Sequence, residues 1–500
     1  MSITMRVHPQ IGAARLSRIA RTFGLERAST QSLQPALATV GAGDPRAEAR
    51  TKRKTRVGAM ALLAALAAVL VVPSSAEAAE PASSTLVVDR DGVQCGNAEY
   101  ISIQAAVDAA QPGDRIKVCP DLYAESVTVD KPLTLFGDPD AVDAVDCFQP
   151  TPSQLDDADS ARQVIIDPAG GGFTIALALR ADDIEVAGIV VQGASVGVDA
   201  SDRFSGYRIH HNLIRLNSLF GVDFGSAGPR QTRADHSCLR ENRYGLVSEL
   251  DDDSLWASPP VADERSEWNQ RDVRNARVDH NLTFRNVTGI DLAGPGHHDQ
   301  LTIDHNVSRE DGAGIALQNS NGSAILENDV ARASSSSIQI GGATSDLTID
   351  SNIVVNGRIG IIFTANGFND RFRQTSHRVQ VTRNTVRGMT FSGINANPGT
   401  AQEPGDLHDS TVADNISTDN GRDGIVLFAG NSGNEVRGNV SERNGRNGIY
   451  AAGARDNTFI GNTALLNVAV DARDDNRPVN TWTGNQCVTD SPAGTICGAG

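Results

Sequence analysis

Apolar and polar side chains alternate in short segments along most of the chain. Within residues 301–306, Leu301 and Ile303 alternate with polar residues, which is the period of a strand with one buried face. A second alternating segment follows at 314–317, and the same Gly-Ile pattern recurs at 424–427 and 448–451. Glycine, asparagine and aspartate interrupt every segment, and helical periodicity is missing beyond the first hundred-odd residues. The pattern predicts many short strands joined by sharp bends.

An asparagine recurs where the first strand of each unit ends. Successive copies are 30, 39, 25, 22, 24, 32, 31, 24 and 23 residues apart, and we interpret the longer steps as the same unit plus a loop. We expect this asparagine to adopt the left-handed backbone of the bend and its amide to bond to its copy in the next coil. Such a period predicts a solenoid of parallel coils around an aliphatic core. The copies are Asn212, Asn242, Asn281, Asn306, Asn328, Asn352, Asn384, Asn415, Asn439 and Asn462.

A short helix is predicted at the start of the solenoid. Ser102 can cap it, Ile103 and Val107 share one face with Ala110, and Pro112 stops it. This helix would cover the unpaired backbone and apolar interior that an open solenoid end exposes.

These segments resemble a known family. Residues 102–110, 113–118 and 131–137 resemble the opening of pectin-lyase-like right-handed parallel β-helix proteins, and the later repeats resemble the parallel β-helix repeats of that group. The resemblance covers roughly residues 84 to 475. It implies an all-β, single-stranded right-handed parallel β-helix of about 11–13 coils of 22–25 residues, with a helical cap at the start and a disulfide-closed cap at the end. The group includes lyases, hydrolases, esterases, epimerases, NosD-type accessory proteins and non-catalytic adhesins, so it leaves the function open.

The chain divides into five expected segments. Residues 1–56 form a leader extension without a core-forming pattern, which we expect to be disordered, and 57–78 form a secretory signal. Its apolar run follows basic residues and ends at a small-residue cleavage site, and a retained membrane anchor is the alternative. Residues 79–150 are interpreted as the amino-terminal cap and first coils, 151–475 as the β-helix and 476–500 as the carboxy-terminal cap. We therefore expect a monomer that is secreted or held at the cell surface, with no membrane contact after cleavage.

Charge narrows the choice of partners. Beyond residue 80, the chain keeps 33 basic against 56 acidic residues, a net charge of −23. A surface this acidic repels nucleic acid and anionic lipid. It favours cations, or substrates held by local arginines or by a bridging metal. Only Lys117 and Lys131 remain among the lysines of that part, so arginine, histidine or a carboxylate must do any basic work along the repeats.

All six cysteines lie beyond the signal, and an even number in an oxidising compartment predicts disulfides. Spacing favours Cys487 with Cys497 and Cys95 with Cys119, which leaves Cys147 for Cys238. Six cysteines allow fifteen pairings, so the connectivity stays open at this point.

Candidate catalytic residues come from strand alternation on the Gly-Ile strands, the face across which the resembled fold binds carbohydrate. With Val198, Val222 and Ile290 inward, the outward neighbours are Asp199, Asp223 and Asp291, followed by Ala316 and Gln339, with Val247 between Asp223 and Asp291. Adjacent strands lie about 4.8 Å apart, so Asp199 and Asp223 are candidates for sharing a cation such as Ca²⁺. Asp223 and Asp291, about twice as far apart, suit acid and base roles in inverting glycoside hydrolysis. Each aspartate has the simpler alternative of a solubilising charge on a strand.

Substrate-binding candidates lie around this face. Arg230, His297 and His298 follow two of these strands and could bind a uronate carboxylate or move a proton. Gln339 joins them on the strand face. The insertions 249–272, 364–377 and 397–409 all follow Gly-Ile-type strands. The first carries Trp256 and Trp268, either a stacking surface for sugar or indoles folded under an acidic loop.

A second constellation is a set of histidines preceding the recurrent asparagine. His211, His280 and His305 occupy like positions, with His210 beside the first, so a cation site or simple bend stabilisation is expected there. Copper handling of the NosD-associated kind would favour soft ligands, but beyond residue 80 only Met389 is a methionine.

The sequence thus predicts a protein acting on an extracellular polysaccharide, with a lyase or hydrolase of an acidic glycan as the leading hypothesis. The alternative is a carbohydrate-binding or cell-surface structural protein without turnover. The motif sets of polygalacturonases and pectin methylesterases are missing, which disfavours those two families.

Overall fold

The computed structural model describes residues 83–143, 145–148, 159–168, 170, 172–226, 228–248, 272–293, 296–364, 375–398 and 406–497. The predictions for the leader extension, for the secretory signal and for Trp256 and Trp268 lie outside these residues. Within the described ranges, no helix is both long enough and apolar enough to cross a membrane.

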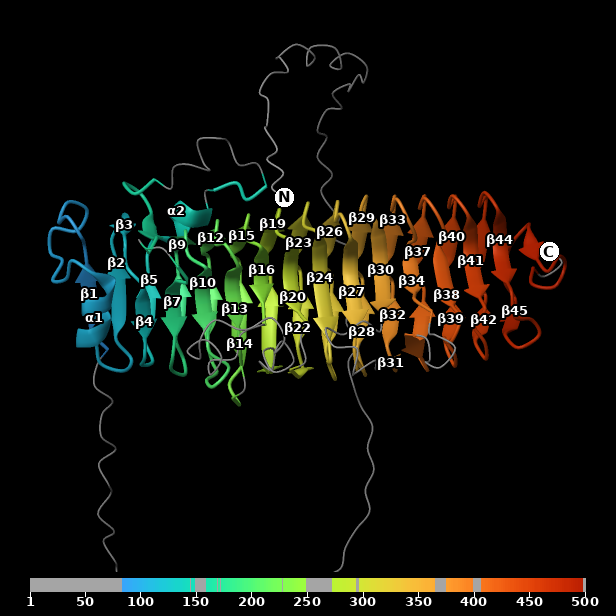
Figure 1. The fold of residues 1–500 in the computed structure, drawn as a ribbon, viewed down its shortest axis with the longest axis horizontal. Coiled ribbons are helices and arrows are strands. Elements are labelled where there is room, and N and C mark those ends of the chain that lie inside the picture. Colours follow the sequence, from blue (N-terminus) through green and yellow to red (C-terminus); the bar gives the residue numbers. More distant parts are fainter. Residues whose placement is uncertain are drawn as a thin grey trace, which may run out of the picture. The chain divides into compact units, whose positions relative to one another are not determined.

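The described chain winds through three long parallel sheets in turn, so that each coil contributes one strand to each sheet. Figure 1 shows the coils stacked in chain order, from the blue amino-terminal end to the red carboxy-terminal end. This is a parallel β-helix, as predicted.

Sheet A contains β1 (Thr85–Val88), β2 (Arg115–Val118), β5 (Thr134–Phe136), β8 (Glu185–Ala187), β11 (Arg208–His210), β14 (Thr232–Asp235), β18 (Ala276–Asp279), β22 (Thr302–Asp304), β25 (Ala324–Leu326), β28 (Thr348–Asp350), β32 (Gln380–Thr382), β36 (Thr411–Ala413), β39 (Glu435–Arg437), β42 (Thr458–Ile460) and β45 (Thr481–Thr483).

Sheet B contains β3 (Asp121–Tyr123), β6 (Val164–Ile166), β9 (Ile189–Gln192), β12 (Leu213–Arg215), β15 (Cys238–Arg240), β19 (Leu282–Phe284), β23 (Val307–Arg309), β26 (Asp329–Ala331), β29 (Ile353–Val355), β33 (Thr385–Arg387), β37 (Ile416–Thr418), β40 (Val440–Glu442) and β43 (Thr463–Leu465).

Sheet C contains β4 (Val127–Val129), β7 (Ile175–Leu179), β10 (Val196–Ala200), β13 (Phe220–Phe224), β16 (Tyr244–Val247), β20 (Thr288–Leu292), β24 (Ala313–Gln318), β27 (Ser336–Gly341), β30 (Ile359–Thr364), β34 (Ile394–Ala396), β38 (Ile425–Phe428), β41 (Asn447–Ala452), β44 (Val470–Asp474) and β46 (Asp490–Ser491). Two short pairs join β17 (Val273–Arg274) to β21 (His298–Asp299) and β31 (Ser376–His377) to β35 (Leu407–His408).

The core is a column of aliphatic side chains one coil apart. In sheet A, the central residues Ile303, Ile325 and Ile349 stand in register on β22, β25 and β28, and none of the three is exposed. Three-residue strands suffice because the central side chain of each one packs into the core and parallel neighbours hold the strand on both sides.

The described residues form two helices, α1 (Ile103–Ala109) and α2 (Pro139–Asp143). The hydroxyl of Ser102 accepts a hydrogen bond from the Ala105 N–H, which is the predicted N-cap. Ile103 and Val107 are fully buried, and α1 packs against β1, β2 and β4 at the first coil.

A column of asparagines joins the coils at the bend between sheets A and B. The amide oxygen of Asn306 accepts hydrogen bonds from the backbone N–H and side-chain amide of Asn281, at 3.0 and 3.1 Å. The same pair of bonds repeats through Asn306, Asn328, Asn352, Asn384, Asn415, Asn439, Asn462 and Asn485. The predicted amide ladder is therefore present.

Two details of the ladder prediction are wrong. The left-handed backbone falls on the residue before each asparagine, as at His280 and His305, both with φ of 55°. Asn242 belongs to a different column, because Ser237 takes the rung between Asn212 and Asn281. The asparagine instead holds the bend to the preceding coil. Its side-chain amide donates a hydrogen bond to a backbone carbonyl there, as Asn281 does to Ala234.

Two shorter ladders occupy the bend between sheets B and C, and each ends on an aspartate. The first runs through Asn217, Asn242, Asn286 and Asp311. The second runs through Asn420, Asn444 and Asn467, and the Asn467 amide donates to Asp471 four residues later on β44.

Three disulfides form, and their pairing is the one that spacing favoured. They are Cys95–Cys119, Cys147–Cys238 and Cys487–Cys497. The first and last lie in the opening and closing segments of the solenoid, and the second ties a loop near α2 to β15 of sheet B.

Candidate functional site

The three predicted acidic residues fall into one register row on sheet C. Asp199 pairs with Asp223, Asp223 with Val247 and Val247 with Asp291. The row continues through Ala316 to Gln339. Asp199 and Asp223 are therefore neighbours on adjacent coils, and Asp223 and Asp291 are two coils apart, as the strand alternation predicted.

Their surroundings differ from a solvated strand surface. Asp199 and Asp223 are 0 % exposed and Asp291 is 8 % exposed, although all three point away from the core. Arg180 binds Asp199, with its Nη2 2.5 Å from Oδ2 and its Nη1 3.1 Å from the Asp199 carbonyl oxygen. The alternation of strand residues cannot predict that this row is buried, because burial depends on which segments pack over the outer face of the sheet.

The structure places the predicted substrate-binding residues in different settings. The guanidinium of Arg230 is held by Asp183 at 2.8 Å and by Asp182 at 3.3 Å. Gln339 is half-buried and accepts a hydrogen bond from Ser336. His297 is exposed, and its backbone N–H donates to Asp272.

His298 is instead a fully buried group. Its Nδ1 lies 2.9 Å from the Gln318 carbonyl oxygen and its Nε2 lies 2.7 Å from the Ser248 hydroxyl oxygen. A carbonyl only accepts, so Nδ1 carries the proton and Nε2 accepts from Ser248. Burial lowers the pKa of His298 to about 4, so the imidazole is neutral near pH 7.

Sheet C strands also mark where the long insertions start. Residues 249–271, 365–374 and 399–405 lie outside the described ranges, and they begin close after the ends of β16, β30 and β34 respectively. The described residues that flank each of these ranges lie between a strand of sheet C and the next strand of sheet A.

On the other edge of sheet C lies a group that the sequence interpretation missed, the arginine–aromatic row. Arg358, Phe391, Arg422 and Arg446 occupy equivalent positions on consecutive coils, linked by backbone hydrogen bonds of 2.8 to 2.9 Å. The Arg422 guanidinium carbon lies 3.9 Å from the centroid of the Phe391 ring. Farther along, the ring of Tyr450 lies between Arg446 at 5.6 Å and Arg473 at 4.8 Å.

The charges of this row are partly unpaired. Arg446 lies 3.7 Å from Asp423, and Arg473 is bound by Asp475. Arg358 and Arg422 are exposed and make no ion pair with any part of the chain that the structure describes. A sequence signal exists, because each position stands two residues before the glycine of a Gly-Ile strand, at 358–361, 391–394, 422–425 and 446–449.

The histidines before the long asparagine ladder stack into a column, the histidine stack. The rings of His211, His236, His280 and His305 lie 5.0, 4.8 and 4.9 Å apart and within 5° of parallel. The sequence pattern missed His236 because a serine follows it in place of asparagine.

Carboxylates hold the later members of the stack. Nδ1 of His236, His280 and His305 lies 2.8 to 2.9 Å from the preceding Asp235, Asp279 and Asp304. The hydrogen bond to Asp304 raises the pKa of His305. His211 differs, because His210 precedes it and their Nδ1 atoms lie 2.8 Å apart.

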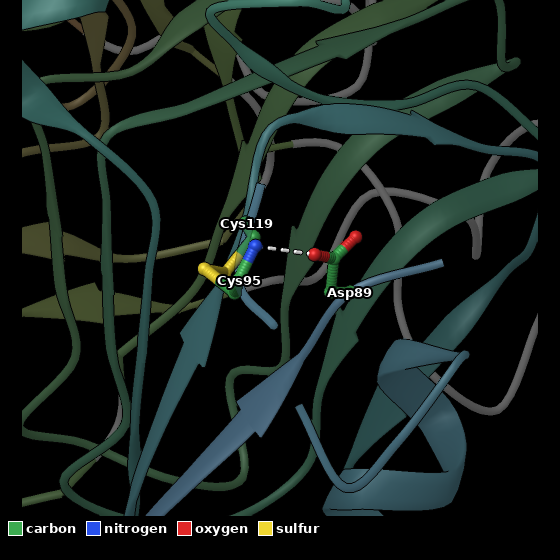
Figure 2. Close-up of side chains that lie close together, drawn as sticks. All are labelled: Asp89, Cys95 and Cys119. Carbon is green, nitrogen blue, oxygen red and sulfur yellow. Dashed lines mark hydrogen bonds between the residues drawn. A yellow bond between two sulfur atoms is a disulfide. The ribbon is translucent and has the colours of Figure 1, made fainter. Parts of the chain in front are cut away.

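Another cluster with metal-ligand atoms has a structural role. Figure 2 shows Asp89 beside Cys95 and Cys119, with the Cys95 N–H donating to the Asp89 carboxylate at 2.5 Å. The two sulfurs are bonded to each other, so neither is the thiolate that a metal requires.

Comparison with protein families gives two matches. Residues 266–374 match the family described as periplasmic copper-binding protein (NosD), and residues 375–464 match right handed beta helix region. The NosD-matched residues contain no cysteine or methionine, and His280 and His305 within them bind aspartates. They do not fit the soft-ligand site that Cu(I) prefers. No curated protein matches the chain.

Solved structures show distant likenesses. The A-module of a mannuronan C-5 epimerase from Azotobacter vinelandii is 11 % identical with a TM-score of 0.38, covering 78 % of this chain and 94 % of that one. A mannuronic acid specific family 6 polysaccharide lyase from human gut microbiota is 12 % identical with a TM-score of 0.44, covering 75 % and 87 %. A GH87 α-1,3-glucanase from Streptomyces thermodiastaticus strain HF3-3 is 14 % identical with a TM-score of 0.42, covering 77 % and 66 %. Likenesses this distant say nothing about the reaction.

Three stacked parallel sheets, the continuous asparagine ladder and the beta helix match agree with one another. The part of the chain that the structure describes is a right-handed parallel β-helix.

Proposed function

We propose that the protein is an exported polysaccharide-binding β-helix protein, and that an anionic glycan lies along the arginine–aromatic row. The observation that carries this proposal is the pair of exposed arginines, Arg358 and Arg422, without ion pairs among the described residues. They stand in a chain whose net charge is −17, where most other arginines are neutralised by a neighbouring carboxylate.

The chemistry of the row suits a uronate polymer. A guanidinium presents a planar fork that binds a carboxylate through two hydrogen bonds, and the half-buried Phe391 supplies a flat apolar surface beside the charges. Tyr450 is buried and supports the row from below. Because consecutive coils repeat these groups along the axis, the row offers a series of equivalent contacts to a chain of repeating sugars.

Turnover is a second candidate function, favoured by the two-coil separation of Asp223 and Asp291. In a hydrolase, this pair would divide the acid and base roles. In a lyase, Asp199 and Asp223 would hold Ca²⁺ against the uronate while an arginine or histidine removed the C5 proton. The burial of all three aspartates and the Arg180–Asp199 ion pair support binding ahead of turnover.

The binding proposal is tested with two double variants of the full chain. Arg358→Ser/Arg422→Ser removes the unpaired charges of the row, whereas Arg378→Ser/Arg437→Ser removes two exposed arginines that pair with carboxylates at sheet A. Affinity for polygalacturonate and alginate, with dextran as the neutral comparison, is measured by calorimetry. We expect the first variant to bind at least tenfold more weakly, about 1.4 kcal/mol, and the second to stay within about twofold. Equal losses in both variants, or no binding by the parent protein, would overturn the proposal.

Turnover is tested separately. The parent protein, Asp223→Asn and Asp291→Asn are incubated with the same glycans, with and without calcium. Unsaturated-product absorbance and reducing ends are then measured. Product that the parent protein forms and both variants fail to form would establish an enzyme. Glycan binding without any product would establish a binding protein without turnover.

A further inference from the structure

A cluster of nitrogen and oxygen atoms that could bind a metal lies around His211, the first member of the histidine stack. His210 ends β11, His211 follows it with a φ of 52°, and Asp235 ends the neighbouring strand β14. One donor atom from each of these three residues lies within 4.8 Å of the others.

The arrangement exists only here among the described rungs of the stack. At His236, His280 and His305, the preceding residue is an aspartate that occupies Nδ1 of the same ring. At His211, the preceding residue is another imidazole, so two Nδ1 atoms face each other across 2.8 Å. Hydrogen bonding can satisfy this pair with one proton between the nitrogens. A metal ion that displaces the proton must lie beside the line between the two nitrogens, so both rings turn to direct their lone pairs at it.

The surrounding carboxylates support a positive charge at this point. Glu185 Oε1 lies 2.9 Å from His210 Nε2, which fixes the ring and leaves Nδ1 directed at His211. Asp143 lies 3.7 Å from His211 Nε2. Asp235 Oδ2 is buried and accepts no hydrogen bond of good geometry, although Arg233 Nε lies 3.0 Å away and Arg208 Nε lies 3.8 Å away.

We propose that His210, His211 and Asp235 bind one divalent transition-metal ion, through the two imidazole Nδ1 atoms and the carboxylate. Imidazole with carboxylate is a donor set for copper, nickel or zinc and not for calcium, which takes oxygen ligands. Two nitrogens bound at about 2.0 Å and at right angles stand about 2.8 Å apart, so the spacing favours the tetragonal geometry of Cu²⁺ or Ni²⁺ over tetrahedral Zn²⁺.

This site is independent of the NosD match and of the glycan proposal. All three residues lie outside residues 266–374. They also lie at the bend between sheets A and B, whereas the arginine–aromatic row lies at the bend between sheets B and C. The stack gives the site a rigid setting, because His211 packs face to face on His236.

The test uses the purified full chain with any tag removed. Cu²⁺, Zn²⁺ and Ca²⁺ are each added alone, stoichiometry and affinity are measured by equilibrium dialysis, and the Cu²⁺ form is examined by electron paramagnetic resonance. We expect one equivalent of Cu²⁺, a tetragonal spectrum with coupling to two nitrogens, weaker Zn²⁺ binding and no binding of Ca²⁺ at this site.

Variants assign the site. His210→Gln and His211→Gln are each expected to weaken Cu²⁺ binding at least 100-fold. His305→Gln is the matched control, because it removes a histidine from the far end of the same stack but leaves the His210–His211 pair intact. Circular dichroism melting checks that each variant is folded. Equal losses in His211→Gln and His305→Gln, a spectrum without nitrogen coupling, or no stoichiometric binding would overturn the proposal.

Discussion

The amino-terminal and carboxy-terminal halves of sheet C use the same coil but treat charge in opposite ways. From β10 to β20, the outward row carries Asp199, Asp223 and Asp291, all buried. From β30 to β44, the same row continues through uncharged residues to Arg473, and the bend before these strands carries the exposed Arg358 and Arg422 beside Phe391.

This difference shows that the backbone of the solenoid does not decide what its outer face does. The hydrogen-bonded framework is saturated by parallel pairing and amide ladders in both halves. The outward residues are therefore free to vary. A charged side chain among them is either buried, where it needs a partner within the protein, or exposed, where it can bind a ligand.

The largest expected effect is on stability, when a buried carboxylate loses a guanidinium that pairs with it. Arg180→Ala leaves the Asp199 carboxylate in a fully buried position without its guanidinium. We expect a loss of about 3 kcal/mol in the free energy of unfolding, measured by urea titration at pH 7. Arg422→Ala at the exposed row is the control and should change it by less than about 0.5 kcal/mol. Similar losses for both variants would remove the contrast between the halves.

A somewhat smaller effect is expected at the two aspartates that end the short ladders. Burial raises the pKa of Asp311 to about 6, despite hydrogen bonds from Thr283, Ser308 and Asn286. Burial also opposes ionisation of Asp471, but hydrogen bonds from Asn467 and from the backbone of Val488 and Thr489 outweigh it, and its pKa is lowered.

These shifts have opposite consequences for stability against pH. The folded state holds its proton on Asp311 more tightly than the unfolded state, so stability falls as pH rises from about 4 to about 6. Asp311→Asn should remove that slope and raise the free energy of unfolding at pH 8 by about 2–3 kcal/mol. Asp471→Asn should lower it by about 1–2 kcal/mol, because an amide nitrogen would face two backbone N–H groups. Denaturant titrations at pH 4 and pH 8 measure both changes, and two shifts of the same sign would contradict this assignment.

The smallest expected effect is that of salt. Exposed charges are screened and buried ones are not. Raising NaCl from 50 to 200 mM should weaken uronate binding several-fold, about 1 kcal/mol, while the Arg180→Ala stability loss stays the same within error. A salt-independent affinity would place the glycan away from the arginine–aromatic row.

The sequence was sufficient to predict the fold and the register of the acidic row. Residues one coil apart become neighbours in a solenoid, so alternation and the asparagine period place Asp199 beside Asp223 and Val247 between Asp223 and Asp291. Spacing alone favoured the cysteine pairing that forms, with Cys147 left for Cys238, but it left the connectivity open.

The rest depended on packing that periodicity does not encode. Nothing in the spacing of Asp199 states that Arg180 reaches it or that the row is buried. His236 and Asn242 show a second limit of prediction from the repeat. Ser237 replaces the recurrent asparagine in the sequence but keeps its hydrogen bond in the ladder, so His236 was missed and Asn242 was placed in the wrong column. The arginine–aromatic row carried a readable signal, since its residues stand at one fixed distance from a repeated glycine.

The aspartates that end the two short ladders determine where a whole coil can be added to the solenoid. A carboxylate accepts but cannot donate, so a duplicated coil at Asp311 would set two acceptor-only groups on facing rungs. A coil duplicated between Asn328 and Asn352 would bring an amide that both receives and passes on the bond. Lengthening of the protein by whole turns is therefore expected to be accepted at that second place and resisted at the first.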